Sequence, residues 1–173
     1  MGTAWALIAR STAEDVNRAV DAADRAFNEG EWPALTPTQR GHLLWKLGEL
    51  VSANAARLAE IEQRDNGKLS SEVTGQVQYV SDYFKYYAGL ADKVQSAVIP
   101  SDKKGVFAYT KYEPKGVVAI ITPWNSPLTL TSWKLAPALA AGCTVVIKPS
   151  EFTSASMIEF AGLFAKRAFP TAS

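Results

Sequence analysis

Two short apolar runs separated by one helical segment constrain the fold of this chain more than any other feature. The runs are GVVAIIT at 116–122 and CTVVIK at 143–148. Both are rich in β-branched residues, which is typical of strands buried on both faces of a parallel sheet. Residues 127–141 between them have a helical pattern that stops at Gly142. The order strand, helix, strand predicts a right-handed crossover and a parallel sheet.

A polar segment that contains proline lies at the end of each predicted strand. TPWN ends the first run and KPSE ends the second. The carboxyl ends of neighbouring parallel strands lie at the same edge of a sheet, and ligands of open parallel sheets bind beyond that edge. Proline fixes the backbone there and cannot continue the ladder of hydrogen bonds. We therefore expect both segments to border one crevice.

Helix-start signals predict the elements before this sheet. Ser11 and Glu14 form a predicted capping box for a first helix. Thr36 is the expected cap of a second helix, with Pro37 at its first position and Gln39 three residues after the cap.

Two more helices are expected before the sheet and one after it. The third ends at Asn66-Gly67, and the fourth begins near Ser70. Thr153 or Ser154 caps the helix that follows the second strand. The apolar residues expected to face inward are Val16, Ala19, Val20, Ala23, Phe27, Leu43, Leu44, Leu47, Leu50, Val51, Leu58, Ile61, Val73, Val77, Val80, Phe84, Tyr87, Leu90, Met157, Phe160, Leu163 and Phe164.

A β-hairpin is expected between the fourth helix and the sheet. Residues 106–112 alternate in period two, and AVIP at 97–100 is a second short strand candidate. The turn-rich SDKKG joins them.

Composition excludes several classes of protein. The net charge is +1 and 47% of residues are hydrophobic, so we expect no nucleic acid or anionic membrane as a partner. The apolar runs are too short to span a membrane. One cysteine allows no intramolecular disulfide and fits a reducing compartment, so the cytoplasm is the expected location. His42 has no Cys or carboxylate cluster at ligand spacing, so we expect no metal site.

Three polar side chains at the strand ends are candidates for chemistry. Asn125 carries an amide that could donate hydrogen bonds to an oxyanion, although a turn-forming role before a helix is the alternative. Lys148 and Glu151 could together hold the hydroxyls of a ribose. Their alternative roles are those of a surface lysine and of a helix-start glutamate.

Cys143 and the tryptophans are expected to be structural. Cys143 begins an apolar strand, at the end of the sheet away from Asn125, and an apolar setting does not produce a thiolate. Trp124 and Trp133 are, from their residue type, more often core than contacts to a cofactor.

Four further segments bear on function: LAEIEQRDNGK, YYAGLADK, EPKGVVAIITPWNSP and WKLAPALAAGCTVVIKPSE. Together they resemble the NAD(P)-dependent aldehyde dehydrogenase superfamily. They occur in the order and spacing of the family, and the resemblance extends over nearly the whole chain. The resemblance implies an α/β fold, with a partial Rossmann-like parallel sheet after a helical N-terminal region and a β-hairpin oligomerisation ribbon. The implied parts are 1–95 (helical), 96–114 (hairpin) and 115–173 (first βαβα part of the cofactor-binding domain).

The resemblance also implies roles for individual residues. Asn125 would help form the oxyanion hole, and Lys134 would belong to a charge relay. The hairpin at 96–114 would mediate a homo-oligomer. The cofactor would be NAD, with NADP possible, because a carboxylate at Glu151 accepts from ribose hydroxyls while Lys148 can pair with a phosphate. The residues implied to contact the cofactor are Ile121, Thr122, Pro123, Trp124, Lys148, Ser150 and Glu151.

Two functional interpretations follow. The first is an aldehyde dehydrogenase that oxidises an aldehyde to a carboxylate with NAD(P)+, present as an N-terminal fragment that is inactive alone. In the family, the nucleophilic Cys, the general-base Glu and the Gly-rich loop lie C-terminal to the residues present. The second is a non-enzymatic truncated product, or a binding or assembly subunit.

Overall fold

The computed structural model describes residues 3–165 of the 173-residue chain and has a helix-rich α/β fold with two small sheets. The last residues of the predicted 115–173 part, 166–173, lie outside the described residues. The elements in chain order are α1 (Ala13–Asn28), η1 (Trp32–Ala34), α2 (Pro37–Ala53), α3 (Ala55–Asn66), α4 (Ser70–Leu90), β1 (Val98–Ile99), β2 (Ala108–Tyr109), β3 (Val117–Ile121), α5 (Pro127–Ala141), β4 (Thr144–Lys148) and α6 (Ala155–Ala165).

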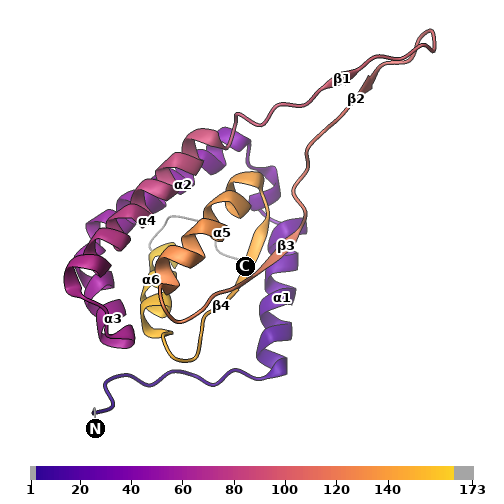
Figure 1. Cartoon of the computed structure of the whole chain (residues 1–173). Coiled ribbons are helices and arrows are strands. Elements are labelled where there is room, and N and C mark those ends of the chain that lie inside the picture. The colour runs from indigo at the N-terminus through magenta and orange to yellow at the C-terminus, as the bar shows by residue number, and fades with distance from the viewer. Residues whose placement is uncertain (1–2, 166–173) are drawn as a thin grey trace.

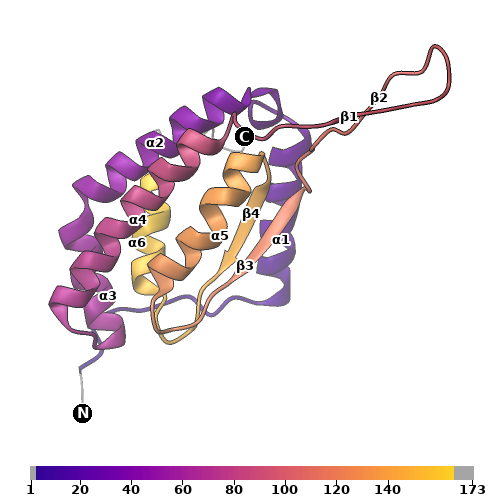
Figure 2. The same ribbon diagram turned by 45° about the horizontal axis from the view of Figure 1, so that its top comes forward.

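The predicted strand–helix–strand unit is present. β3 pairs with β4 in parallel, from Val117 opposite Thr144 to Ile121 opposite Lys148, and α5 connects them. α5 packs on one face of this sheet and α1 on the other (Figures 1 and 2). The alternation of side chains explains both contacts, because Val145 packs against the core while the Thr144 hydroxyl donates to Ala23 O of α1 at 2.8 Å.

The prediction that both strands are buried on both faces is wrong. Ile120 is the one fully buried residue of β3, and Ile121 is 69% exposed. The predicted inward stripe of α1 is likewise partly open, with Val16 50% and Val20 41% exposed. The physical reason is that the sheet of residues 3–165 has only two strands, so it offers α1 too little area to cover that stripe.

A layer of helices forms the main core beside the sheet. α4 packs along α2 and α5, and α3 and α6 close one end of the layer (Figure 1). The predicted inward faces of α2, α4 and α6 are confirmed at Leu44, Leu47, Val51, Val73, Val77, Val80, Phe84, Met157, Phe160 and Leu163, while the predicted inward residue Leu90 is 37% exposed.

Most helix ends follow the sequence signals. Thr36 and Gln39 form the predicted capping box of α2. Gly67 and Gly142 end α3 and α5 in the left-handed conformation, with φ of 73° and 96°. The first capping box is one residue further along than predicted, because Thr12 caps α1 and the Asp15 carboxylate accepts from the Thr12 N–H at 2.8 Å.

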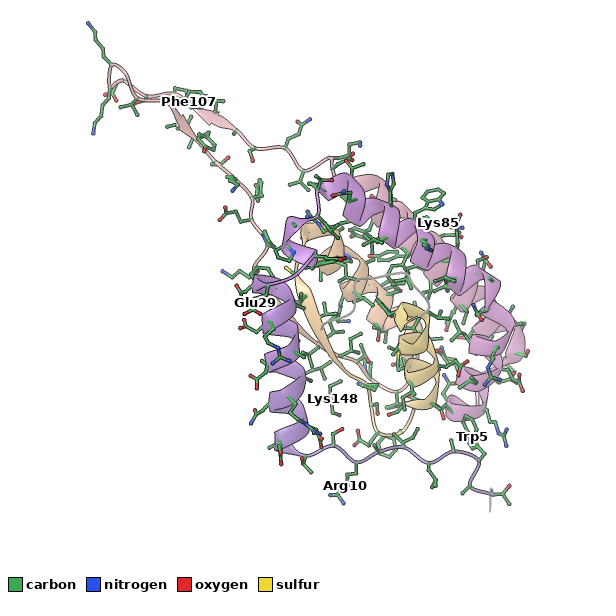
Figure 3. All side chains as sticks on the ribbon, turned by 180° about the vertical axis from the view of Figure 1, so that it is seen from behind. Trp5, Arg10, Glu29, Lys85, Phe107 and Lys148 are labelled. Carbon is green, nitrogen blue, oxygen red and sulfur yellow. The ribbon has the colours of Figure 1, made fainter. Side chains whose placement is uncertain are left out.

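The hairpin projects away from the rest of the chain (Figures 1 and 2). β1 and β2 are antiparallel, with Val98 opposite Tyr109, but each has only two residues and is shorter than predicted. Its side chains are open to solvent, including Phe107 at 72% exposed near the tip (Figure 3). Pairing is short because no helix or further strand of the described chain covers either face.

Two glycines of α2 allow its close approach to α4. A Cβ at Gly41 would lie 2.6 Å from Ala88 O, and one at Gly48 would lie 2.9 Å from Ser81 O. The Ser81 hydroxyl donates to Gly48 O at 2.8 Å, so the second approach is also a hydrogen-bonded contact.

We predict that Gly41→Ala destabilises the fold by about 1–3 kcal/mol, because the new methyl group must push α2 away from α4. Gly75→Ala on the exposed side of α4 is the matched control, since nothing lies within 4 Å of its Cβ position. That control should stabilise by about 0.5–1 kcal/mol through helix propensity. Urea unfolding followed by circular dichroism measures both, and equal effects of the two changes would contradict the close packing.

Candidate functional site

The loops that follow β3 and β4 lie side by side at the carboxyl end of the sheet. Thr122 N–H donates to Lys148 O at 3.3 Å and extends the parallel ladder by one bond. The Thr153 hydroxyl donates to Trp124 O at 3.1 Å. Two hydrogen bonds therefore join a loop of residues 122–126 to a loop of residues 148–154.

Lys148 and Glu151 form an exposed ion pair at this edge. The Nζ of Lys148 lies 3.6 Å from Oε2 of Glu151, and the side chains are 63% and 72% exposed. Figure 3 shows Lys148 at the end of β4. The pKa of Glu151 is lowered, first by its own backbone N–H and then by the Lys148 ammonium, so the carboxylate is ionised at neutral pH. The pair presents one charge of each sign to solvent.

The other predicted cofactor contacts divide into open and buried side chains. Ile121 and Trp124 are 69% and 56% exposed, and Pro123 is also exposed. Thr122 is buried, and its Oγ1 accepts from the Thr131 hydroxyl at 3.4 Å. Ser150 is 8% exposed, and its Oγ accepts from Phe152 N–H at 3.3 Å, so this hydroxyl stabilises the turn.

Asn125 borders an open cavity between α4 and α5. The cavity has a volume of about 580 Å³, and Tyr79, Leu130 and Trp133 are among the residues that line it. Trp133 is 45% exposed, so the expectation that it belongs to the core is wrong, as it is for Trp124. Trp133 lies on α5 and Trp124 lies in the loop after β3, both at solvent-exposed positions. Residue type alone does not reveal this exposure.

Lys134 directly follows Trp133 on α5. Its ammonium donates to Leu130 O of its own helix at 3.1 Å and is exposed. The structure therefore brings Asn125, Trp133 and the strand-end loops to one edge, and leaves the Lys134 ammonium on the helix surface.

Glu62 is a buried carboxylate that the sequence reasoning missed. Its side chain is 0% exposed, Oε2 accepts from Leu128 N–H at 3.3 Å, and Oε1 has no hydrogen-bond partner. Burial raises its pKa to about 7, against the lowering effects of the Leu128 N–H and the Lys68 ammonium. Glu62 follows Leu58 by four residues, so it lies on the predicted buried stripe of α3, and this spacing was the available signal.

The end of α3 makes further contacts with the two loops. Asp65 Oδ2 accepts from Ala155 N–H at 2.8 Å, and burial raises the pKa of Asp65. Lys68 Nζ donates to Ser126 Oγ at 2.5 Å and to Gln76 Oε1 at 2.9 Å. No local pattern indicated the contacts of Lys68 with Ser126 and of Asp65 with Ala155, because these partners are 58 and 90 residues apart along the chain.

Cys143 and His42 take no part in this edge. Cys143 is 5% exposed at the opposite end of β4, and its Sγ accepts from Lys115 N–H at 3.3 Å. His42 is exposed on α2. Within residues 3–165, no three His, Cys, Asp or Glu side chains gather closely enough to hold a metal ion. In the same range, no helix has the length and apolar character needed to cross a membrane.

The model of the Aldehyde dehydrogenase family matches residues 1–172 of this chain. A similar curated protein is (Z)-2-((N-methylformamido)methylene)-5-hydroxybutyrolactone dehydrogenase of Acinetobacter baylyi, with 50% identity over 98% of this chain and 35% of the relative. The chain therefore spans about a third of the length of the relatives that it matches.

Solved structures resemble the chain to a similar extent. Betaine aldehyde dehydrogenase from Staphylococcus aureus in complex with NAD+ has a TM-score of 0.91 at 39% identity, over 95% of this chain and 33% of that one. The NAD+ complex of aldehyde dehydrogenase from Bacillus cereus has a TM-score of 0.87 at 41% identity, over 91% and 32%. The chain therefore resembles these two structures in both fold and sequence.

The raised pKa of Glu62 generates a prediction about stability. The folded state holds a proton on Glu62 up to about pH 7, whereas an unfolded glutamate loses it near 4.5. The folded state therefore binds more protons between these values, and the contribution of Glu62 to stability falls as pH rises from about 4.5 to 7. The free energy of unfolding should decrease by roughly 3 kcal/mol over this range. Above pH 7 the contribution of Glu62 should no longer change with pH.

Urea unfolding of wild type and Glu62→Gln at pH 5, 6, 7 and 8 measures this change. The stability of wild type relative to Glu62→Gln should decrease across the series, because glutamine does not titrate. Glu60→Gln, at an exposed position of the same helix, should show no such trend. A difference between wild type and Glu62→Gln that is the same at every pH would refute the assignment.

Proposed function

The chain belongs to the aldehyde dehydrogenase family, and on that premise we propose that its strand-end loops bind NAD+ in the oxidation of an aldehyde to a carboxylate. The observation that carries the proposal is the exposed Lys148–Glu151 pair beside the exposed Trp124, at the carboxyl end of two parallel strands. This is the edge at which open parallel sheets bind nucleotides. NAD+, when bound, supplies the hydride acceptor.

The charges of the pair fit the adenosine ribose. The ionised Glu151 carboxylate accepts hydrogen bonds from the 2′- and 3′-hydroxyls, and the Lys148 ammonium donates to one of them. A 2′-phosphate would place negative charge against Glu151 and remove a donor, so NAD+ is preferred. Lys148 can pair with that phosphate, so NADP+ is weakened rather than excluded. Ile121, Thr122, Pro123 and Trp124 form the neighbouring wall, and Ser150 shapes the turn.

Asn125 and the cavity beside it suit the aldehyde. The Asn125 side chain is exposed at the rim of the cavity, where its Nδ2–H group would donate to an oxygen that gains negative charge. The aromatic and apolar side chains of Tyr79, Leu130 and Trp133 would contact the rest of the substrate. Lys134 lies further along α5 and would act through the charge of its ammonium.

The hairpin is the proposed contact with a second copy of the chain. Val98, Phe107 and Tyr109 are 66%, 72% and 60% exposed on a projecting pair of strands with free edges. Exposed apolar side chains on such an edge favour pairing with another chain. On this basis we keep 96–114 as a separate assembly segment between a helical part, 1–95, and a Rossmann-like part that begins at 115. A binding or assembly role without catalysis is the second candidate, favoured by the buried position of Cys143.

We predict different effects of two substitutions on cofactor binding. Lys148→Ala should weaken binding of both NAD+ and NADP+ by about tenfold, because one charge-assisted hydrogen bond is lost. Glu151→Gln should lower the preference for NAD+ over NADP+ by about tenfold, because the repulsion of a 2′-phosphate disappears. Isothermal titration calorimetry of the 173-residue chain with each cofactor measures both effects.

The control is a second exposed ion pair of the same chain. Lys111 and Glu113 lie 2.7 Å apart on the hairpin arm, with side chains 67% and 65% exposed. Lys111→Ala and Glu113→Gln should leave both affinities within twofold of wild type. If the Lys148 and Glu151 variants bind both cofactors as wild type does, the ribose site is elsewhere.

We also predict that the 173-residue chain forms no NADH from aldehydes. Its single cysteine, Cys143, is buried, and the Sγ accepts a hydrogen bond from a backbone amide in an apolar setting that does not favour a thiolate. Absorbance at the NADH wavelength, with short and aromatic aldehydes, should stay at the level of a sample without protein. Turnover that is lost in Cys143→Ala would overturn the structural interpretation of this cysteine.

A further inference from the structure

The two helices that follow the site loops are capped from outside. α5 begins directly after the loop 122–126, and its N-cap residue, Ser126, makes no side-chain capping bond. Ser154 lies at the N-cap position of α6, because its C=O accepts from Ile158 N–H, while the hydroxyls of Thr153 and Ser154 donate to Trp124 O and Ser150 O. The first N–H groups of a helix have no partner within the helix, so both N-termini need acceptors from elsewhere.

The last turn of α3 supplies both acceptors. Glu62 accepts from Leu128 N–H in the first turn of α5, and Asp65 accepts from Ala155 N–H in the first turn of α6. The two carboxylates are three residues apart on one helix, so about one turn of rigid backbone fixes the distance between the two N-termini. An exposed ion pair, Arg57 to Glu159 at 2.9 Å, also joins α3 to α6.

The residues that follow Asp65 contact the first loop directly. Asn66 Nδ2 donates to Asn125 O at 3.5 Å, and Lys68 Nζ donates to Ser126 Oγ at 2.5 Å. Lys68 N–H in turn donates to Asn66 Oδ1 at 3.0 Å, so this turn is braced internally. The segment 62–68 therefore contacts the backbone beside Asn125 and the N-terminus of the helix that follows Glu151.

We propose that Glu62 and Asp65 are positioning residues which hold the Asn125 loop and the Lys148–Glu151 loop in register with each other. This inference rests on the proposed function, because it assigns the two loops to one site. Neither carboxylate is placed to contact the cofactor, since Glu62 is fully buried and each makes its bond to a helix N-terminus. Their effect on binding is therefore exerted through the position of Asn125, Lys148 and Glu151.

The physical basis is the fixed geometry of a short, buried hydrogen-bonded link. Beyond the Thr122–Lys148 bond at the strand ends, the Thr153–Trp124 bond is a single link between the two loops, and a single link permits rotation of one loop against the other. Two further anchors on α3 remove that freedom. A site whose two halves are displaced by about 1 Å loses much of its binding and catalytic power, up to a hundredfold in rate.

Hydrogen exchange of the wild-type chain tests the anchors without any substitution. The amides of Leu128 and Ala155 should exchange at least tenfold more slowly, relative to their intrinsic rates, than that of Glu14. Glu14 is also in the first turn of a helix, but it is exposed and no carboxylate accepts from its N–H. Exchange at Leu128 or Ala155 as fast as at Glu14 would overturn the proposal.

Substitutions then separate positioning from general stability. Asp65→Ala and Glu62→Ala should each weaken NAD+ binding by about tenfold, speed exchange at Ala155 and Leu128 respectively, and shift the Asn125 side-chain amide resonance. Asp65→Asn and Glu62→Gln keep an acceptor and should restore affinity to within twofold of wild type. Glu60→Ala, on the exposed side of α3, is the matched control and should leave all three measurements unchanged.

The outcomes distinguish this proposal from the proposed function. If wild type does not bind NAD+, the proposed function fails, and the exchange rates and the Asn125 resonance still decide the positioning role. If Asp65→Ala and Glu62→Ala bind NAD+ as wild type does at a temperature where circular dichroism shows both folded, the positioning role is wrong. The same conclusion follows if Asp65→Asn and Glu62→Gln fold but do not restore affinity.

Discussion

Two helix N-termini and two strand ends meet at one edge of the structure. The first N–H groups of these helices have no partner within their own helix, and the need for acceptors determines which residues pack beside them. α5 and α6 begin there, Ser126 makes no side-chain capping bond to α5, and the hydroxyls of Thr153 and Ser154 before α6 donate to Trp124 O and Ser150 O. Glu62 and Asp65 of α3 accept from the first turns instead. The position of α3 is thus tied to the edge of the sheet, and α3 is in turn packed against α4 and α6.

This arrangement leaves the loop side chains available for a ligand. A loop that caps its own helix uses its polar side chains to do so. With acceptors supplied by α3, the Asn125 amide and the Glu151 carboxylate are exposed at the edge, as is Lys148. Glu62 is the unfavourable part of this arrangement, because it is a fully buried carboxylate with one oxygen unpaired and a pKa raised to about 7. An unfavourable buried group beside a candidate site fits the general pattern that exceptions to packing rules occur at functional sites.

Local signals in the sequence predicted the elements well, and long-range contacts were not predictable in the same way. The capping box at Thr36, the glycine stops at Gly67 and Gly142, and the two parallel strands all depend on neighbouring residues. The first capping box was placed one residue early because Ser11–Glu14 and Thr12–Asp15 both fit the pattern, and only the backbone conformation decides between them.

The wrong predictions concern partners that lie far away in the chain. The exposure of Val16 and Val20 depends on how many strands stand opposite α1. The Asp65 carboxylate that accepts from Ala155 N–H was not predicted, because it lies ninety positions before the start of α6. Of the missed residues, Glu62 was the easiest to predict from the sequence, since its spacing from Leu58 puts it on a buried face. The burial of Ser150 and the openness of Trp133 follow from the turn and from the cavity, which no residue pattern encodes.

The central claim is that the loops at the ends of β3 and β4 bind the adenosine half of NAD+. The most direct measurement is a titration of the 15N-labelled chain with NAD+, followed by the shifts of assigned backbone amides. The account predicts the largest changes at Lys148–Glu151 and at the amides of Thr122, Trp124 and Asn125, with the hairpin amides unchanged. Changes confined to other parts of the chain, or no change at saturating NAD+, would contradict it.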